Sequence, residues 1–234
     1  MGINTLNIAG IEATKDDSYY QHARQEIEPL LPREAQTIVD VGCGVGNTAR
    51  WLKNKFPKSK VIGLEGFPEN ETALRNNVDQ AFIVDLNGST PDIGKPDLML
   101  FLDVLEHLPN PEMVLAKLTK TMPLGSKIIV SVPNIANLSV SARLFFRNEF
   151  EYRDAGILDR THMRFFVRDS AVKLLEGAGF KVYAGVRTGF WSRKRRVINA
   201  LTLGLMIEKL TYQLIMVGEK TSDPSPTKIR WTRF

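Results

Sequence analysis

The chain has 234 residues, of which 43% are hydrophobic and 24% charged, and its 31 Lys and Arg residues exceed its 26 Asp and Glu residues by only five. This balance predicts one globular domain, and the small cationic excess excludes a typical DNA-binding protein and disfavours RNA as a partner. A single cysteine rules out an internal disulfide framework. The sequence shows no secretory signal and no apolar stretch of membrane-spanning length, so we expect a cytoplasmic protein.

Apolar strand-like segments alternate with helix-like segments along the chain. In chain order, the sequence predicts a helix at 18–31, a strand at 37–44, a helix at 47–56, a strand at 60–66, a helix at 71–77, a strand at 81–87, a strand within 96–107, a helix at 111–122, a strand at 126–134, a helix at 168–180, and strands at 180–187 and 212–220. Because the strands are apolar on both faces and alternate with helices, they are typical of an α/β fold with a parallel sheet covered on both sides.

A glycine-rich turn joins the first predicted strand to the following helix. Gly42, Gly44 and Gly46 lie in the segment VDVGCGVGN, where glycines let the backbone turn sharply and approach a ligand closely. Asp40 precedes them, and Glu65 ends the next strand, where an acid can accept hydrogen bonds from both hydroxyls of a ribose. The third glycine of the dinucleotide-binding spacing is absent, which favours a cofactor without a pyrophosphate.

These segments resemble the motifs of class I S-adenosylmethionine-dependent methyltransferases. VDVGCGVGN is similar to the first motif of that family, GLEG to its ribose-binding acidic motif and IVDLN to its adenine-binding motif, and the resemblance covers roughly residues 18–220. It implies a Rossmann-like sandwich around a seven-stranded sheet, mostly parallel, with an antiparallel last strand. It also implies one methyltransferase domain over residues 1–220, followed by a polar tail at 221–234.

The resemblance implies roles for individual residues in holding S-adenosylmethionine. Asp40 would orient the amino group of the cofactor and Glu65 would hold its ribose, whereas Asp85 would face the adenine amine or simply cap a turn. Tyr20 and Arg24 would close over the methionine carboxylate, or they would belong to a packed amphipathic helix. The implied cofactor contacts are Tyr20, Arg24, Asp40, Gly42, Cys43, Gly44, Gly46, Glu65, Gly66, Asp85, Leu86, Leu102 and Asp103.

Two acids and a histidine follow the fourth strand in the segment FLDVLEHLPNP. On a helical turn Asp103 shares a face with Glu106 and His107, at the sheet edge where ligands of α/β folds bind, and His162 in LDRTHMRFF approaches the same edge. Two carboxylates and two imidazoles suit a divalent metal such as Mg, Mn or Zn. The set is similar to that of ubiquinone-pathway O-methyltransferases and of small-RNA ribose methyltransferases. Alternatively, the two acids stabilise the N-terminus of a helix through its dipole, and His107 packs against the fold.

Without a metal, His162 is the first candidate for a general base and His107 the second. A neutral imidazole can take a hydroxyl proton near pH 7, whereas methyl transfer itself needs little acid–base chemistry. The alternative is that His162 is a loop histidine bonded to Asp159 or to the backbone.

Residues 134–166, which we call the insertion, form a connection longer than the fold requires, and such connections at a ligand-bearing edge are usually functional. The blocks SVPN and GILDRTHMRFF resemble a methyltransferase branch associated with bacterial surface-glycan or lipid-linked glycan synthesis, so we expect acceptor specificity here. Its aromatic rings would stack on the acceptor or pack on the sheet, and its arginines would bind acceptor anions or stay solvated. These residues are Phe145, Phe146, Phe150, Tyr152, Arg143, Arg147, Arg153, Arg160 and Arg164.

A basic run precedes an apolar helical pattern at residues 191–210. Such a segment can lie on an anionic membrane surface, which would place the protein peripherally at the inner face of a membrane. The alternative is a helix that packs on the sheet between the last two strands.

These patterns predict S-adenosylmethionine-dependent methylation of a hydroxyl on a small-molecule or glycan acceptor. Oxygen is favoured because the Asn/Asp-Pro-Pro-Tyr signature of amino methylation is absent after the fourth strand. The alternatives are a non-catalytic module that binds the cofactor as an assembly partner, a nicotinamide-dependent oxidoreductase, and a metal-dependent ribose 2′-O-methyltransferase acting on RNA.

Overall fold

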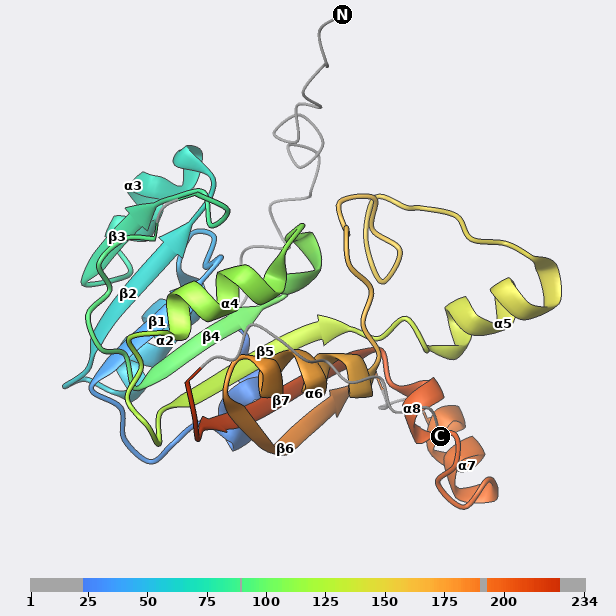
Figure 1. The fold of residues 1–234 in the computed structure, drawn as a ribbon. Helices are drawn as coiled ribbons and strands as arrows, with labels where there is room; N and C mark the ends of the chain where they lie inside the picture. The colour runs from blue at the N-terminus through green and yellow to red at the C-terminus, as the bar shows by residue number, and fades with distance from the viewer. Residues whose placement is uncertain (1–22, 89, 190–192, 224–234) are drawn as a thin grey trace, which may run out of the picture.

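The computed structural model describes residues 23–88, 90–189 and 193–223. Within them the chain forms a seven-stranded sheet in the order β3-β2-β1-β4-β5-β7-β6, which Figure 1 shows with helices on both faces. The strands are β1 (Thr37–Val41), β2 (Lys60–Glu65), β3 (Gln80–Ile83), β4 (Leu98–Leu102), β5 (Lys127–Pro133), β6 (Phe180–Thr188) and β7 (Gln213–Lys220).

The strand directions confirm the predicted sheet. β1 pairs in parallel with β2 and β4, β2 with β3, and β4 with β5, whereas β7 runs antiparallel to both β5 and β6. The reversed strand β7 therefore begins at the edge where the parallel strands end. Its first residue, Gln213, is in register with Pro133 at the end of β5, so it can contribute a side chain to that edge.

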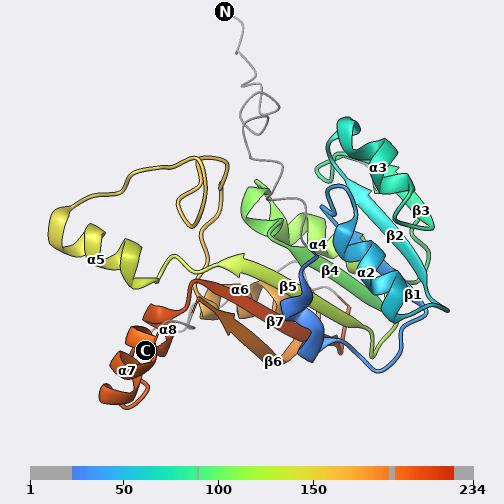
Figure 2. The same ribbon diagram turned by 180° about the vertical axis from the view of Figure 1, so that it is seen from behind.

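Helices cover the sheet in two layers. The first part of the chain supplies one layer, made of η2, α2 and α3, and the other layer contains α4 and α6 (Figures 1 and 2). The helices are η2 (Gln25–Leu30), α2 (Asn47–Lys55), η3 (Pro68–Asn70), α3 (Glu71–Arg75), η4 (Leu105–His107), α4 (Pro111–Thr119), α5 (Leu138–Arg147), α6 (Arg168–Gly177), α7 (Arg193–Leu201) and α8 (Ile207–Leu210).

An apolar core fills the space on each face of the sheet. Successive residues of a strand point to opposite faces, so Ile38 of β1 belongs to the core that contains Leu52 of α2, and Val39 to the core that contains Leu115 of α4. Both faces are buried, which explains why the strands read as continuous apolar runs. The polar residues at the ends of the strands lie outside these cores, so a binding site can form there.

The helix predicted at residues 18–31 is wrong over its described part. Residues 23 and 24 are not helical, and η2 is a 3-10 helix that contains Pro29. Proline has no N–H group, and its ring clashes with the carbonyl four residues earlier, so an α-helix does not run through it. Residues 18–22 lie outside the described residues.

Two other segments differ from the sequence-based expectation. The insertion contains α5, which was not predicted, and the N–H of Ile135 donates to the carbonyl of Phe166 at 2.9 Å across its base. The helical pattern at 191–210 is divided into α7 and α8, and no helix among the described residues is long and apolar enough to cross a membrane. The described side chains of α7 are largely exposed, so the alternative of a helix packed on the sheet is not what the structure shows.

Candidate functional site

The turn after β1 requires glycine. Gly42 has a φ of +65°, and a Cβ at this residue would lie 2.5 Å from Cγ2 of Val104. Its N–H donates to the carbonyl of Leu64 at 2.8 Å, which ties the turn to the end of β2, and Gly46 caps the start of α2. The turn, in which Gly42 is exposed, and the side chain of Glu65 therefore lie at one edge of the sheet.

Glu65, the last residue of β2, is buried and held at both carboxylate oxygens. Its Oε2 accepts from the N–H of Gly44 at 2.7 Å, and its Oε1 accepts from the N–H of Phe67 at 3.0 Å and from Nδ2 of Asn70 at 3.4 Å. A carboxylate has about four lone-pair sites, so this one retains capacity for further hydrogen bonds. A Cβ on Gly66 would meet no atom within 4 Å, so open space adjoins the acid.

Asp40, near the end of β1, is buried, and its Oδ2 makes no hydrogen bond with the residues that the structure describes. Burial, and then the charge of Glu65, raise the pKa of Asp40 to about 7 against the opposing charge of Arg24. Burial and the same two acids also raise the pKa of the Cys43 thiol, which disfavours its thiolate. A cationic group that reached Asp40 would stabilise its charged form.

The remaining predicted cofactor residues have contacts that turn capping or core packing explains. Asp85 lies beyond β3 and is exposed, and its Oδ1 accepts from the N–H and the Nδ2 of Asn87 at 2.9 and 3.0 Å, which is a turn-capping arrangement. Leu86 packs against one core and Leu102 ends β4 against the other. Tyr20 lies outside the described residues.

Arg24 and Asp103 form the centre of a polar network at the ends of β4 and β5 and the start of β7. The guanidinium group of Arg24 pairs with Asp103 and with Glu26. Oδ1 of Asp103 also accepts from Oγ of Ser131 at 2.8 Å and from Nε2 of Gln213. Asp103 has a φ of +60°, a strained conformation that costs roughly 1–3 kcal/mol and persists where the surroundings hold it.

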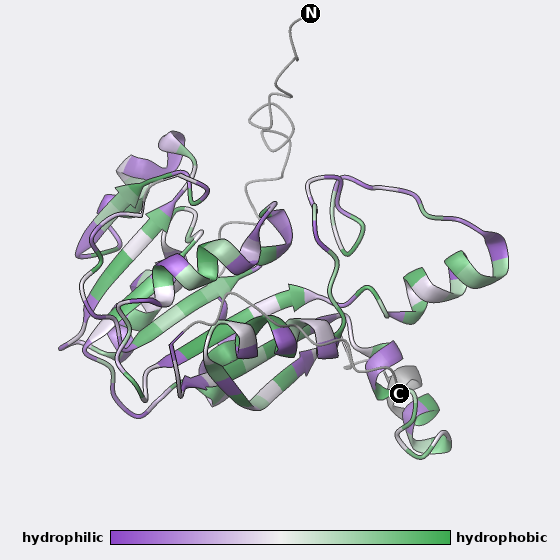
Figure 3. Ribbon diagram, viewed as in Figure 1, coloured by the Kyte–Doolittle hydropathy of each residue, from purple (hydrophilic) through white to green (hydrophobic). Residues whose placement is uncertain are grey.

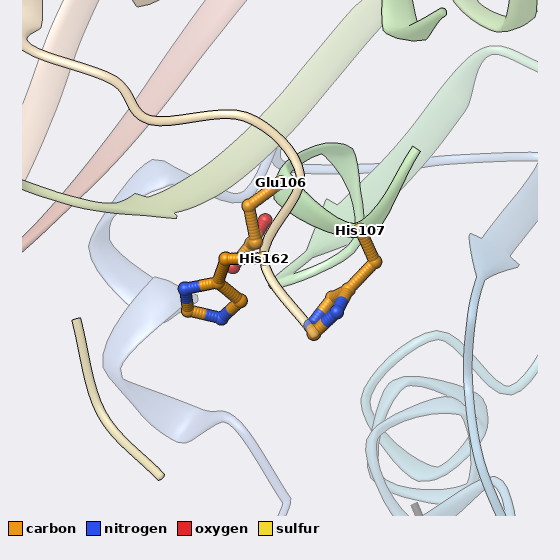
Figure 4. A group of neighbouring side chains, drawn as sticks. All are labelled: Glu106, His107 and His162. Carbon is orange, nitrogen blue, oxygen red and sulfur yellow. The ribbon is translucent and has the colours of Figure 1, made fainter. Parts of the chain in front are cut away.

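Glu106, His107 and His162 form a compact cluster. Each offers one ligand atom within 4.8 Å of the others, and the two imidazole rings meet edge to face with centroids 4.8 Å apart. Figure 4 shows Glu106 and His107 projecting from η4 beside the loop that carries His162. The carbonyl of Glu106 accepts the N–H groups of Met163 and Arg164 at 2.8 and 3.0 Å, which fixes this loop against η4.

Backbone carbonyls orient both imidazoles of the cluster. Nδ1 of His107 lies 3.3 Å from the carbonyl oxygen of Thr161, and Nδ1 of His162 lies 3.1 Å from that of Ile157. Because a carbonyl can only accept, each Nδ1 carries a proton, and Nε2 of the neutral ring is the acceptor atom. His162 is thus bonded to the backbone, as the structural alternative expected, and the same bond sets the tautomer that a proton acceptor or a metal ligand uses.

The structure separates Asp103 from the other three predicted metal ligands. Arg24, Ser131 and Gln213 occupy its carboxylate, and the cluster consists of Glu106, His107 and His162 without it. Sequence reasoning did not find Ser131 or Gln213. Both residues could have been found as polar side chains in predicted strands, close to the edge of the sheet where ligands bind.

Residues of the insertion, together with Tyr212, line an open hollow of about 200 Å³. Ile157 lines this hollow and its carbonyl also accepts from His162, whereas neither His107 nor His162 lines it. Phe145 and Phe146, for which the sequence offered stacking on the acceptor or packing on the sheet, do not line it and are exposed.

Other side chains of the insertion contact one another. Phe150 meets Tyr152 and Phe165 edge to face, with ring centroids 5.6 and 5.7 Å apart. Arg143 pairs with Glu149 at 3.0 Å, so part of the cationic character of the insertion is neutralised within it. The rings thus contact one another, whereas the sequence offered stacking on the acceptor or packing on the sheet.

A family model described as a methyltransferase domain matches residues 14–184. The chain belongs to this methyltransferase family. The matched segment includes the glycine turn, the two buried acids and the cluster around His162. The family assignment therefore agrees with the class I resemblance of the motifs.

Curated relatives match over part of the chain. A trans-aconitate 2-methyltransferase of Variovorax paradoxus is 29% identical over 113 residues, which are 47% of this chain and 44% of the relative. N-methyltransferase 4 of Papaver somniferum is 22% identical over 166 residues, covering 56% of this chain and 47% of the relative. The matches span somewhat less than half the length of these relatives.

Solved structures match over nearly the whole chain. A S-adenosylmethionine-dependent methyltransferase from Archaeoglobus fulgidus has a TM-score of 0.59 and 18% identity, and the match covers 91% of this chain and 94% of that one. At this identity the likeness shows the fold alone, and it confirms the predicted Rossmann-like class I architecture.

Proposed function

We propose that the protein uses S-adenosylmethionine to methylate a hydroxyl oxygen on a small-molecule or glycan acceptor. The observation that carries this proposal is the pair of buried acids, Asp40 and Glu65, on either side of the glycine turn. S-adenosylmethionine has a cationic amino group and a ribose with two neighbouring hydroxyls, and these groups complement the two acids. The family of the chain and its fold support the same assignment.

The residues of the chain position the reactants. S-adenosylmethionine, when bound, supplies a methyl group already activated on a sulfonium. Glu65 would accept hydrogen bonds from the ribose hydroxyls, and Asp40 would take the amino group directly or through water. Arg24, at the edge of the same site, would share its charge between Asp103 and the methionine carboxylate. The main contribution of the protein is alignment of the acceptor oxygen with the methyl carbon and the sulfur.

The histidine pair supports oxygen as the acceptor atom, because a hydroxyl must lose its proton when it is methylated. His162 is our choice for the general base, since its Nδ1 is fixed on a carbonyl and Nε2 is its accepting atom. His107 packs edge to face against it and is the second candidate. The trans-aconitate relative is named for a small molecule, which supports a small acceptor.

The protein is expected to release heat on binding S-adenosylhomocysteine and to transfer radiolabelled methyl groups to a nucleotide sugar, a lipid-linked glycan or a quinone precursor, and not to small RNA. His162→Ala is expected to lower kcat about 10²- to 10⁴-fold with product affinity unchanged, because it removes only the proton acceptor. Met163→Ala, an exposed neighbour, is the matched control. A folded sample without heat of binding would overturn the proposed function, and full activity of His162→Ala would exclude the base role.

A divalent cation also fits this cluster. Two imidazoles and one carboxylate form a donor set that suits Zn or Mn better than Mg. When bound, such a cation would supply a Lewis acid next to the acceptor oxygens. Glu106, His107 and His162 would hold it, and Asp103 would stay with Arg24.

Titration of Mn²⁺ or Zn²⁺ into chelator-treated protein is expected to show one saturable site by calorimetry. Glu106→Gln should weaken that site at least about tenfold, since it removes the anionic ligand. Glu149→Gln, which changes a partly exposed acid of the insertion, should leave it unchanged. Equal affinity in wild type and Glu106→Gln would exclude this cluster as a cation site, and unchanged turnover after chelation would exclude a cation from the reaction.

A further inference from the structure

Five large apolar side chains stand almost fully in water at two projecting segments. Phe145 and Phe146, in the last turn of α5, are 81% and 80% exposed, and Leu201, Leu203 and Leu205, at the turn between α7 and α8, are 79%, 92% and 85% exposed. Figure 3 shows hydrophobic colour at both places. Scattered exposed apolar residues are ordinary, whereas groups of them mark interaction surfaces. We call these five residues the two-arm surface.

The two arms lie at one end of the molecule and are joined at their bases. Figures 1 and 2 both show α5 and α7 projecting from the same end of the fold. Nδ2 of Asn137, the N-cap of α5, donates to the carbonyl of Thr211 at 2.7 Å, just after α8. Nδ2 of Asn134 donates to the carbonyl of Glu208 at 2.7 Å. These buried bonds hold the base of one arm against the base of the other.

The turn between α7 and α8 places leucine where glycine is usual. The N–H of Leu203 donates to the carbonyl of Ala200 at 3.1 Å, and that of Gly204 donates to Asn199 at 2.8 Å, which is the bonding pattern of a Schellman turn. Leu203 has a φ of +50°, which is unfavourable for a leucine. Its side chain makes almost no contact with the fold, so the folded chain gains no packing from it.

Cationic residues occur in the same sequence segments as the apolar tips. Residues 193–210 contain five Lys and Arg residues and one acid, and four of the cations are the consecutive residues 193–196 at the start of α7. The acid, Glu208, pairs with Arg168 of α6. α5 contains Arg143 and Arg147 and no acid. The net charge of residues 193–210 is therefore positive, whereas Arg143 of α5 is paired with Glu149 and Glu151.

We propose that the two-arm surface docks on the anionic face of a lipid bilayer. The leucine and phenylalanine side chains would enter the interface between head groups and acyl chains, and the flanking cations would lie at the anionic head groups. Projecting tips of this kind suit a fluid layer that they can penetrate. This attachment is peripheral, and it goes beyond the proposed methyl transfer because it does not depend on the acceptor.

Flotation of the full chain with vesicles tests the docking. The protein is expected to float with vesicles of phosphatidylcholine and phosphatidylserine, to float less in 0.5 M salt because the charges are screened, and to stay unbound with pure phosphatidylcholine. Phe145→Ser with Phe146→Ser, and separately Leu201→Ser with Leu203→Ser, should each lower the partition coefficient about tenfold or more. Leu124→Ser, which changes an exposed leucine in the turn between α4 and β5, should bind as wild type.

Three results would overturn the docking proposal. One is absence of co-flotation with anionic vesicles at low salt. The second is wild-type partitioning of both arm variants, each checked for folding by thermal unfolding and for unchanged affinity for S-adenosylhomocysteine. The third is a dimer in sedimentation analysis without vesicles that the arm variants dissociate, which would assign the surface to a second copy of the chain.

Discussion

Glu65→Gln is expected to weaken the binding of S-adenosylmethionine about 10²-fold or more. Glu65 accepts N–H groups at both oxygens, from Gly44 and from Phe67. A glutamine has one acceptor oxygen and one NH₂ group, so one of these buried N–H groups would face another donor. The ribose would also lose the charged acceptor of its hydroxyls, and hydrogen bonds to charged groups contribute about 1.5–3 kcal/mol each. Two such bonds amount to a factor of about 10² to 10⁴ in affinity.

Calorimetry with S-adenosylmethionine or its demethylated product measures the effect. Glu71→Gln is the matched control, because Glu71 is a nearby exposed glutamate that pairs with Arg75 one helical turn away. The control should keep the affinity of the wild type. If Glu65→Gln is folded and binds within threefold of the wild type, Glu65 does not hold the ribose.

The sheet could be predicted because the signal for it is local. The buried run from Ile38 to Val41 is apolar apart from Asp40, and β2, β4, β5 and β7 contain similar buried runs, whereas the edge strands β3 and β6 are only partly buried. Asp40 and Glu65 were found for the same reason, since each lies at the end of a strand next to the glycine turn. The antiparallel direction of the last strand came from the family resemblance and not from its residues.

The partner of Asp103 could not be predicted from local patterns. Arg24 lies 79 positions away and Gln213 lies 110 positions away in the sequence. A helical turn that includes Asp103 would have placed it beside Glu106 and His107, but the left-handed conformation at Asp103 turns the chain before η4 begins. The cluster and the ion pair are consequently two separate features.

Of the two exposed arms, the helical pattern at 191–210 was predicted, whereas α5 was not. α5 has an apolar face by pattern, but Val140 is its one buried residue, because no other element of the described chain covers the rest of that face. A single sequence does not distinguish a face that meets the core from a face that meets another partner. Phe145 and Phe146 were expected either at the acceptor or packed on the sheet, and they are instead exposed at the two-arm surface.

Asp40→Asn is expected to change the pH dependence of folding in the unliganded protein. The pKa of Asp40 is about 7 in the folded chain, against an ordinary value of 3.8, so between these values the folded state holds a proton that the unfolded state has released. The wild type should therefore lose roughly 2–3 kcal/mol of unfolding free energy from this group between pH 5 and pH 8. The variant cannot titrate there, so its stability relative to the wild type should rise by that amount over the same interval.

Denaturant titrations at pH 5 and pH 8 measure this difference. Asp154→Asn is the control, because Asp154 is an exposed aspartate of the insertion and should shift stability equally at both pH values. Wild-type and Asp40→Asn profiles that run parallel would show that the carboxyl of Asp40 titrates at its ordinary pKa in the folded protein.

The same carboxyl should make cofactor binding depend on pH. An amino group that binds beside Asp40 favours the ionised acid, so the affinity of the wild type for S-adenosylhomocysteine is expected to fall up to about tenfold for each pH unit below 7. Asp40→Asn should bind more weakly at pH 8 and lose this dependence, because no proton has to leave. At pH 8, Asp40→Asn would therefore raise the stability of the unliganded protein relative to the wild type and lower its affinity for the cofactor. The buried charge of Asp40 opposes folding, and the same charge attracts the amino group of the cofactor. Equal pH dependence of binding in both proteins would place the amino group elsewhere.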